Sequence, residues 1–170
     1  MMSGSSLIAL SKKWREKMVN ETRGDLLSAD VEIKVHQTNI WGIMGAGIAA
    51  QIREKYPKVN KEYVDWCENH AKDGLIGTIF VCKAEDGSRI CNMFSQNVVA
   101  RDATLTNYGA FKECLKLLHE YMEKRDIRSV GFPKYIGCGI AGGNWSVIEP
   151  LIRKEFEEDE KVNCLIVEFG

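Results

Sequence analysis

The stretch Gly42-Ile43-Met44-Gly45-Ala46-Gly47-Ile48-Ala49-Ala50 decides how this sequence is interpreted. It follows residues 32–37, whose alternating apolar and polar side chains are typical of a strand, and it opens residues 46–56, whose apolar side chains recur at helical spacing. Glycines let main-chain N–H groups approach an anion closely, and a helix N-terminus adds partial positive charge. The stretch is therefore predicted to be a phosphate-binding loop.

A second stretch repeats the same order of strand, glycine loop and helix. It reads Phe132-Pro133-Lys134-Tyr135-Ile136-Gly137-Cys138-Gly139-Ile140-Ala141-Gly142-Gly143-Asn144-Trp145. In parallel α/β sheets, ligands bind at the carboxyl ends of strands, where both loops emerge. We expect the two loops to flank a single pyrophosphate.

Two other interpretations of the first loop stay open. Residues 45–50 match the pattern GxGxxA of a dinucleotide-binding Rossmann domain, which requires an acidic residue about 20 positions later at a strand end. Asp65 and Glu68 have about that spacing, but they lie within a helical pattern, and the loop follows the second strand instead of the first. A tight strand-to-helix turn with no ligand is the other alternative.

The remaining sequence predicts an α/β fold in the order β, β, α, α, β, β, α, β, α, β from residue 19 onward. Pro57 is expected to end the first long helix, and residues 77–82 and 89–94 are expected to form a hairpin around the turn at 85–88. The other expected elements are a helix at 104–124, a strand at 129–133, a capped helix at 144–156 and a strand at 162–169. They predict a three-layer α/β/α domain at 19–170 with a mixed, largely parallel sheet, preceded by an N-terminal extension at 1–18.

Composition sets limits on the function. With 45% hydrophobic and 28% charged residues, a net charge of -1 and a pI near 6.3, the chain is typical of a globular domain, and nucleic acid is disfavoured as its main partner. No run is long and apolar enough for a membrane span. The six cysteines have no zinc-binding spacing and several fall inside apolar runs, so we expect reduced, buried thiols in a cytoplasmic protein without a metal site. We also expect a monomer that needs no cofactor.

Four short motifs resemble the macro domain family. They are Gly24-Asp25-Leu26, then His36-Gln37-Thr38-Asn39 leading into Gly45-Ala46-Gly47-Ile48-Ala49, and then Ile136-Gly137-Cys138-Gly139 followed by Trp145. They are most similar to the branch that contains the terminal ADP-ribose protein glycohydrolase and the ADP-ribose-1''-phosphate phosphatases of yeast, bacteria and phages. The resemblance covers roughly residues 19–169 and implies a cleft that binds ADP-ribose.

The resemblance also implies which residues bind the ligand. Asp25 matches the aspartate that accepts a hydrogen bond from the adenine amino group, Asn39 faces the distal ribose, and Phe169 either borders the adenine or packs in the core. The full set is Asp25, Leu26, Asn39, Gly45, Ala46, Gly47, Ile48, Ala49, Phe94, Ser95, Gln96, Pro133, Gly137, Cys138, Gly139, Ile140, Ala141 and Phe169.

The catalytic residues of the protein glycohydrolase branch do not carry over. That branch uses a lysine that attacks the distal ribose and an aspartate in the second phosphate loop, and these positions hold Gln96 and Ala141 here. An amide is no nucleophile, and a methyl group cannot transfer a proton. The remaining candidates are Asn39, which can orient a water, and His36, whose ordinary pKa suits acid–base chemistry. A lone histidine on an alternating strand is, however, also typical of a hydrogen-bonded core residue.

These observations favour a hydrolase that removes the terminal phosphate from ADP-ribose-1''-phosphate, or one that releases ADP-ribose from a modified protein or nucleic acid. The first is preferred, with water attacking a phosphoryl group held beside Asn39 and His36. The alternative is a reader that binds ADP-ribose or ADP-ribosylated protein without turnover. An NAD-dependent oxidoreductase is a third, and it requires NAD binding comparable to that of ADP-ribose.

Overall fold

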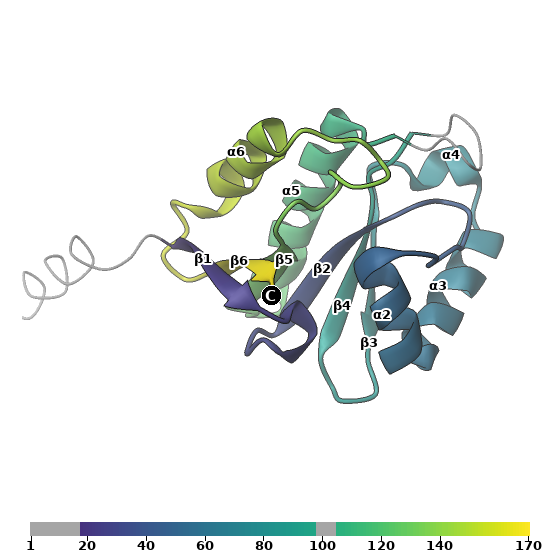
Figure 1. Cartoon of the computed structure of the whole chain (residues 1–170), viewed down its shortest axis with the longest axis horizontal. Coiled ribbons are helices and arrows are strands. Elements are labelled where there is room, and N and C mark those ends of the chain that lie inside the picture. Colours follow the sequence, from purple (N-terminus) through teal and green to yellow (C-terminus); the bar gives the residue numbers. More distant parts are fainter. Residues whose placement is uncertain (1–17, 98–104) are drawn as a thin grey trace, which may run out of the picture.

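One mixed sheet organises the protein, as the computed structural model of residues 18–97 and 105–170 shows (Figure 1). The expected N-terminal extension lies almost entirely outside these described residues. The sheet has six strands in the order β1-β6-β5-β2-β4-β3, and only β3 runs antiparallel to its neighbour. The strands are β1 (Val19–Gly24), β2 (Ile33–Thr38), β3 (Ile79–Lys83), β4 (Arg89–Phe94), β5 (Ser129–Pro133) and β6 (Asn163–Phe169).

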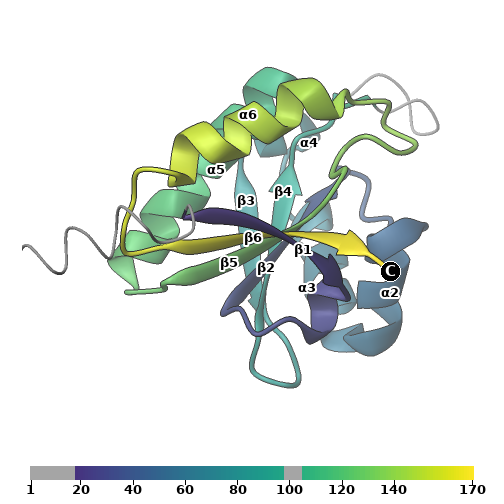
Figure 2. The same ribbon diagram turned by 60° about the vertical axis from the view of Figure 1, so that its left-hand side comes forward.

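Helices cover both faces of the sheet, which confirms the predicted α/β/α class. In Figure 2, α5 (Tyr108–Lys124) and α6 (Trp145–Phe156) lie on one face, and α2 (Gly47–Lys55) and α3 (Pro57–Glu68) lie on the other. The described chain also contains the short helix α4 (Lys72–Leu75) and the 3-10 helix η1 (Leu26–Ser28).

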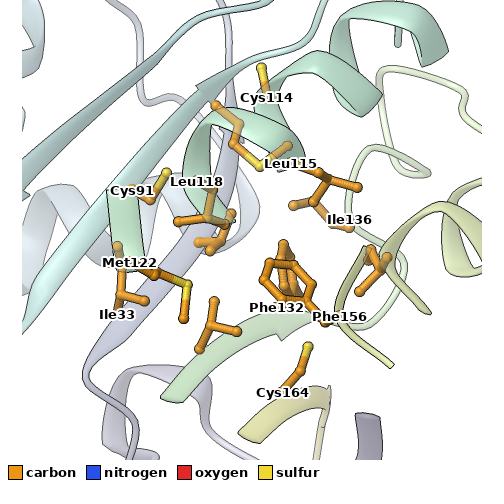
Figure 3. Close-up of a cluster of buried hydrophobic side chains, with 14 of the residues drawn as sticks. Ile33, Cys91, Cys114, Leu115, Leu118, Met122, Phe132, Ile136, Phe156 and Cys164 are labelled. Carbon is orange, nitrogen blue, oxygen red and sulfur yellow. The ribbon is translucent and has the colours of Figure 1, made fainter. Parts of the chain in front are cut away.

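Each face of the sheet has its own hydrophobic core because side chains alternate along a strand. Under α5 and α6, the helical stripe Leu115, Leu118 and Met122 packs with Phe132 and Phe156 (Figure 3). Under α2 and α3, a second cluster contains Ile52, Val59, Tyr63, Ile90 and Phe94. The two cores fix the strand ends relative to one another, and those ends carry the glycine loops.

The helix boundaries confirm one prediction and correct another. The helix α2 ends at Lys55, just before Pro57, as predicted, and Pro57 is itself the first residue of α3, where proline is well accommodated because no intrahelical N–H bond is needed. The helix expected at 104–124 begins at Tyr108, because the side chain of Asn107 caps it by accepting a hydrogen bond from the N–H of Ala110. Residue 104, the first of that expected helix, lies outside the described residues.

All six cysteine thiols are free, and all but Cys138 are buried. Burial raises the pKa of Cys82 and of Cys114 to about 12, so both stay protonated at neutral pH. Within residues 18–97 and 105–170, no helix combines the length and the apolar character that crossing a bilayer requires.

Candidate functional site

A cleft of about 770 Å³ opens at the carboxyl ends of the five parallel strands. Gly24, Thr38, Gln96, Pro133 and Val167 line it, one from the end of each of these strands or from the residues just beyond. The volume falls within the range of small-molecule sites, and the position is the one where parallel α/β sheets bind ligands. Both glycine loops line this one cleft, so they face a shared space as the sequence predicted.

Side chains hold the first loop, residues 39–47, in shape. Asn39 Oδ1 accepts a hydrogen bond from the N–H of Trp41 at 2.9 Å, and Asn39 Nδ2 donates to the carbonyl of Ile43 at 2.8 Å. The hydroxyl of Tyr63 donates to the carbonyl of Asn39, and Arg53 donates to the carbonyl of Met44 at 2.8 Å. The Asn39 side chain thus shapes the loop while it lines the cleft.

The first loop ends at an uncapped helix. Ala46 is the N-cap of α2, and its methyl side chain forms no capping hydrogen bond. The first N–H groups of a helix have no intrahelical acceptor, and they carry partial positive charge. Ala46, Gly47, Ile48 and Ala49 all line the cleft. This end of the cleft therefore suits an anion.

The second loop, residues 134–143, is held mainly through its carbonyl groups. The carbonyl of Gly137 accepts hydrogen bonds from the hydroxyl of Thr106 at 2.6 Å and from the N–H of Gly143 at 2.8 Å. The carbonyl of Ala141 accepts from the N–H of Thr106 at 3.0 Å. Within the described residues, the N–H groups of Gly139, Ile140 and Ala141 form no hydrogen bond, and these residues line the cleft.

Asp25 and Phe169 line the cleft from the ends of the edge strand β1 and its neighbour β6, where Gly24 pairs with Phe169. Asp25 caps η1, since its Oδ1 accepts from the N–H of Leu27 at 3.0 Å. The buried Lys34 donates from Nζ to the carbonyl of Leu27 at 2.6 Å and so fixes the turn. Phe169 is 74% exposed, so the alternative that it packs in the core is wrong.

Most residues predicted to bind the ligand line the cleft. They are Asp25, Leu26, Asn39, Gly45, Ala46, Gly47, Ile48, Ala49, Gln96, Pro133, Gly137, Gly139, Ile140, Ala141 and Phe169. Gln96 is half-buried, and its Oε1 has no hydrogen-bond partner among the described residues.

Four predicted site residues do not line the cleft. Phe94 is fully buried against Tyr63, and Ser95 is fully buried and donates to Gln37. Cys138 turns away from the cleft toward the core beneath α5 and α6, although its neighbours line the cleft. Of the three predicted neighbours at 94–96, only Gln96 therefore reaches the cleft.

The fourth residue is His36, the predicted acid–base group. Its ring is fully buried, and Nε2 lies 2.7 Å from Oδ1 of Asn92 on the neighbouring strand β4. Burial lowers the pKa of His36 to about 4, so the ring is neutral at pH 7. His36 cannot reach a ligand in the cleft, and the core interpretation replaces the catalytic one.

Several residues that line the cleft were not predicted from the sequence. They are Gln37, Ile43 and Tyr135, which stand within the quoted motifs, and Gln51, which directly follows one of them. Among the described residues, no group of three or more His, Cys, Asp or Glu side chains is arranged to hold a metal ion.

Comparison with known proteins connects this cleft to one family. Residues 35–152 match the family described as Macro domain. A DNA ADP-ribosyl glycohydrolase of Thermus aquaticus is 28% identical over 151 residues, which cover 89% of this chain and 41% of that protein. An ADP-ribose 1''-phosphate phosphatase of Candida albicans is 27% identical over 148 residues, which cover 81% of this chain and 93% of that protein.

The lengths of these relatives differ. The chain spans 36% of a Thermosipho africanus fusion protein that joins DNA ADP-ribosyl transferase and glycohydrolase, and 41% of the Thermus aquaticus protein. It therefore corresponds to less than half of these two relatives, whereas it corresponds to nearly the whole Candida albicans phosphatase.

Solved structures show the same architecture. The macrodomain of Mycobacterium tuberculosis DarG superposes with a TM-score of 0.78 at 28% identity, and the match covers 89% of this chain and 98% of that one. Thermosipho africanus DarTG in complex with ADP-ribose superposes with a TM-score of 0.72 at 21% identity, over 89% of this chain and 42% of that one.

Proposed function

The chain belongs to the macro domain family, and we propose that its cleft binds ADP-ribose, with residues 19–170 as the working domain. The observation that carries this proposal is that two main-chain loops with open N–H groups line one cleft of about 770 Å³. Hydrogen bonds from such groups to a charged diphosphate contribute about 1.5–3 kcal/mol each, so a few of them suffice for specific binding.

The proposed pose follows from the chemistry of the two ends of the cleft. The adenine lies beside Asp25, whose carboxylate accepts from the exocyclic amine, and beside the exposed ring of Phe169. The diphosphate lies between the start of α2 and residues 139–141, and the distal ribose lies near Asn39 and Gln96. Aromatic contact with a base contributes about 1–3 kcal/mol, which makes Phe169 a significant part of the adenine site.

For the reaction, we propose hydrolysis of ADP-ribose-1''-phosphate. The oxygen of a water forms a bond to phosphorus, and the bond between phosphorus and the ribose oxygen breaks with its electron pair staying on that oxygen. One proton of the water passes to the ribose oxygen, and ADP-ribose and phosphate leave. The N–H groups of both loops stabilise negative charge, and Asn39 borders the reacting end. His36 takes no part because its ring is fully buried and does not line the cleft. The Candida albicans relative, which spans about the same length, supports this choice.

Release of ADP-ribose from a modified protein or nucleic acid is the second hydrolytic reaction, and the names of the DNA ADP-ribosyl glycohydrolases support it. A reader without turnover is the competing function. Gln96 and Ala141 favour it, because neither supplies a nucleophile or moves a proton. For either function we propose a monomer in the reducing cytoplasm that needs no cofactor.

One experiment separates these functions. Calorimetry with ADP-ribose is expected to show binding by the wild type and none by Gly45→Glu, which places a carboxylate in the first loop. Release of phosphate or ADP-ribose is then followed from ADP-ribose-1''-phosphate and from aspartyl-, glutamyl- and nucleobase-linked ADP-ribose. Binding without any release supports the reader, and absence of binding by the wild type overturns the proposal. If Asn39→Ala leaves phosphate release unchanged, Asn39 has no role in the reaction.

A further inference from the structure

Three side chains link the end of β4 to the second glycine loop. The hydroxyl of Ser95 lies 2.7 Å from Oε1 of Gln37, and Nε2 of Gln37 lies 3.0 Å from the hydroxyl oxygen of Thr106. The same hydroxyl lies 2.6 Å from the carbonyl of Gly137. Thr106 therefore connects Gln37, whose side chain lines the cleft, to the second glycine loop.

The donor and the acceptor in each of these three hydrogen bonds follow from one group, the carbonyl of Gly137. A main-chain carbonyl only accepts, so the hydroxyl of Thr106 donates its single proton to Gly137. That hydroxyl must then accept from Gln37, which turns the Gln37 amide nitrogen toward Thr106 and its oxygen toward Ser95. Ser95 consequently donates. The hydroxyl of Thr106 both accepts and donates, so removing it breaks two of these hydrogen bonds at once.

Thr106 also fixes the other end of the loop. Its main-chain N–H donates to the carbonyl of Ala141 at 3.0 Å, so one residue holds carbonyls on both sides of residues 138–140. The packing is close, because a Cβ added at Gly137 would lie 2.9 Å from both the Thr106 hydroxyl oxygen and Gln37 Oε1. There is no room for a side chain at Gly137, where the Thr106 hydroxyl contacts the loop.

We propose that Thr106 is a positioning residue, which holds the second glycine loop in the shape that presents the N–H groups of residues 139–141 to the cleft. Thr106 does not line the cleft itself, so its effect on a ligand is exerted through the loop. This inference rests on the proposed binding of ADP-ribose, which it deepens.

The test compares two threonine substitutions. Thr106→Val keeps the shape of the side chain but removes the hydroxyl, and we expect affinity for ADP-ribose to fall about tenfold. Thr106→Ser keeps the hydroxyl and should restore affinity to within about twofold. Thr78→Val is the matched control, because the Thr78 hydroxyl donates to the carbonyl of Leu75 at the same 2.6 Å but lies outside the cleft.

Affinity is measured by calorimetry well below the unfolding temperature of each variant. A role confined to general stability lowers the melting temperature of Thr106→Val and Thr78→Val alike and leaves both affinities at the wild-type value, and that result overturns the inference. If the wild type itself does not bind ADP-ribose, the proposed function fails first, which is a separate outcome.

Ser95→Ala provides the test if Thr106→Val does not fold. Ser95 is buried and does not line the cleft, and its hydroxyl donates to Gln37, so Ser95→Ala weakens the connection to Thr106 without removing a side chain that lines the cleft. We expect a two- to threefold loss of affinity, and faster amide exchange at Gly143, whose N–H bonds to the carbonyl of Gly137. Unchanged affinity together with unchanged exchange at Gly143 contradicts the inference.

Discussion

The two glycine loops look alike in the sequence but present different groups to the cleft. The first runs into α2, whose N-cap is Ala46, a residue with no side chain able to cap the helix. The second runs into α6, whose N-cap Asn144 accepts from the N–H and the hydroxyl of Ser146. The helix end is thus left open at the first loop and closed at the second. An anion in the cleft would meet a helix N-terminus on one side and only loop N–H groups on the other.

The loops are also held by different kinds of contact. Asn39 and Arg53 bind carbonyls of the first loop from residues near it in sequence, on the preceding strand end and on α2. Thr106 binds the second loop from a segment about 30 residues away. The first loop is therefore held mostly by residues near it in sequence, with one contact from Tyr63 on α3, whereas the second depends more on a segment distant in sequence.

The largest effect is expected from closing the open helix end. Ala46 has φ -150° and ψ 164°, the extended conformation typical of an N-cap, so Ala46→Asp can cap α2 without strain. The new carboxylate accepts hydrogen bonds from the first N–H groups of α2, and its negative charge repels the diphosphate. We expect affinity for ADP-ribose to fall at least a hundredfold, while stability rises by about 0.5–2 kcal/mol.

Calorimetry and denaturant unfolding measure these two opposite changes. Ala46→Asn is the control, since it caps the helix without the charge and should lose less affinity. If Ala46→Asp binds as tightly as the wild type, the start of α2 is not an anion site.

A smaller effect is expected from crowding the second loop. Gly137 has φ +74°, and an added Cβ would lie 2.9 Å from two polar atoms. Gly137→Ala should lower the free energy of unfolding by about 1–3 kcal/mol. Gly139→Ala is the matched substitution in the same loop, where a Cβ meets no atom within 4 Å, and it should cost much less. Equal losses of stability in the two variants would show that crowding at Gly137 is relieved by local movement.

Removing the cap of α6 should affect stability but not binding. Asn144→Ala deletes the side chain that accepts from Ser146, which is expected to cost about 1 kcal/mol of stability. Asn144 does not line the cleft, so the affinity for ADP-ribose should stay within about twofold of the wild type. A large loss of affinity would mean that the start of α6 contributes to the site, contrary to the contrast between the two helices.

Much of the fold could be predicted because its signals are local. The stripe of α5 and the turn at 85–88 predict a helix and a hairpin from neighbouring residues alone. The predicted order is confirmed for the six strands and for α2, α3, α5 and α6, whereas the short helices η1 and α4 were not predicted. His36 could not be assigned, because an alternating strand does not reveal whether its polar face meets solvent or a second core. Thr106 gave no signal at all, because its role arises only when β2, β4 and the second loop meet.

The smallest effect concerns the end of α6, the helix that follows the second loop. His119 on α5 has Nε2 at 2.6 Å from Asp159 and Nδ1 at 3.3 Å from Glu155. Burial lowers the pKa of His119, but the hydrogen bonds to Asp159 and Glu155 outweigh it, so the pKa is raised overall. His36, on the strand that leads to the first loop, shifts in the opposite direction, to about 4.

A raised pKa means that the folded state holds the proton more tightly than the unfolded state. The contribution of His119 to stability is therefore fully present below its ordinary pKa of about 6.5, and it is lost as pH rises through the higher folded value. His119→Asn should consequently be more destabilising at pH 6 than at pH 9, by less than about 1 kcal/mol because the partners are partly exposed. Asp159→Asn should show the same dependence, since it removes the other half of the pair. Denaturant unfolding at the two pH values measures both variants, and equal destabilisation at pH 6 and pH 9 would mean that His119 joins α5 to α6 through packing against Phe156 and not through its charge.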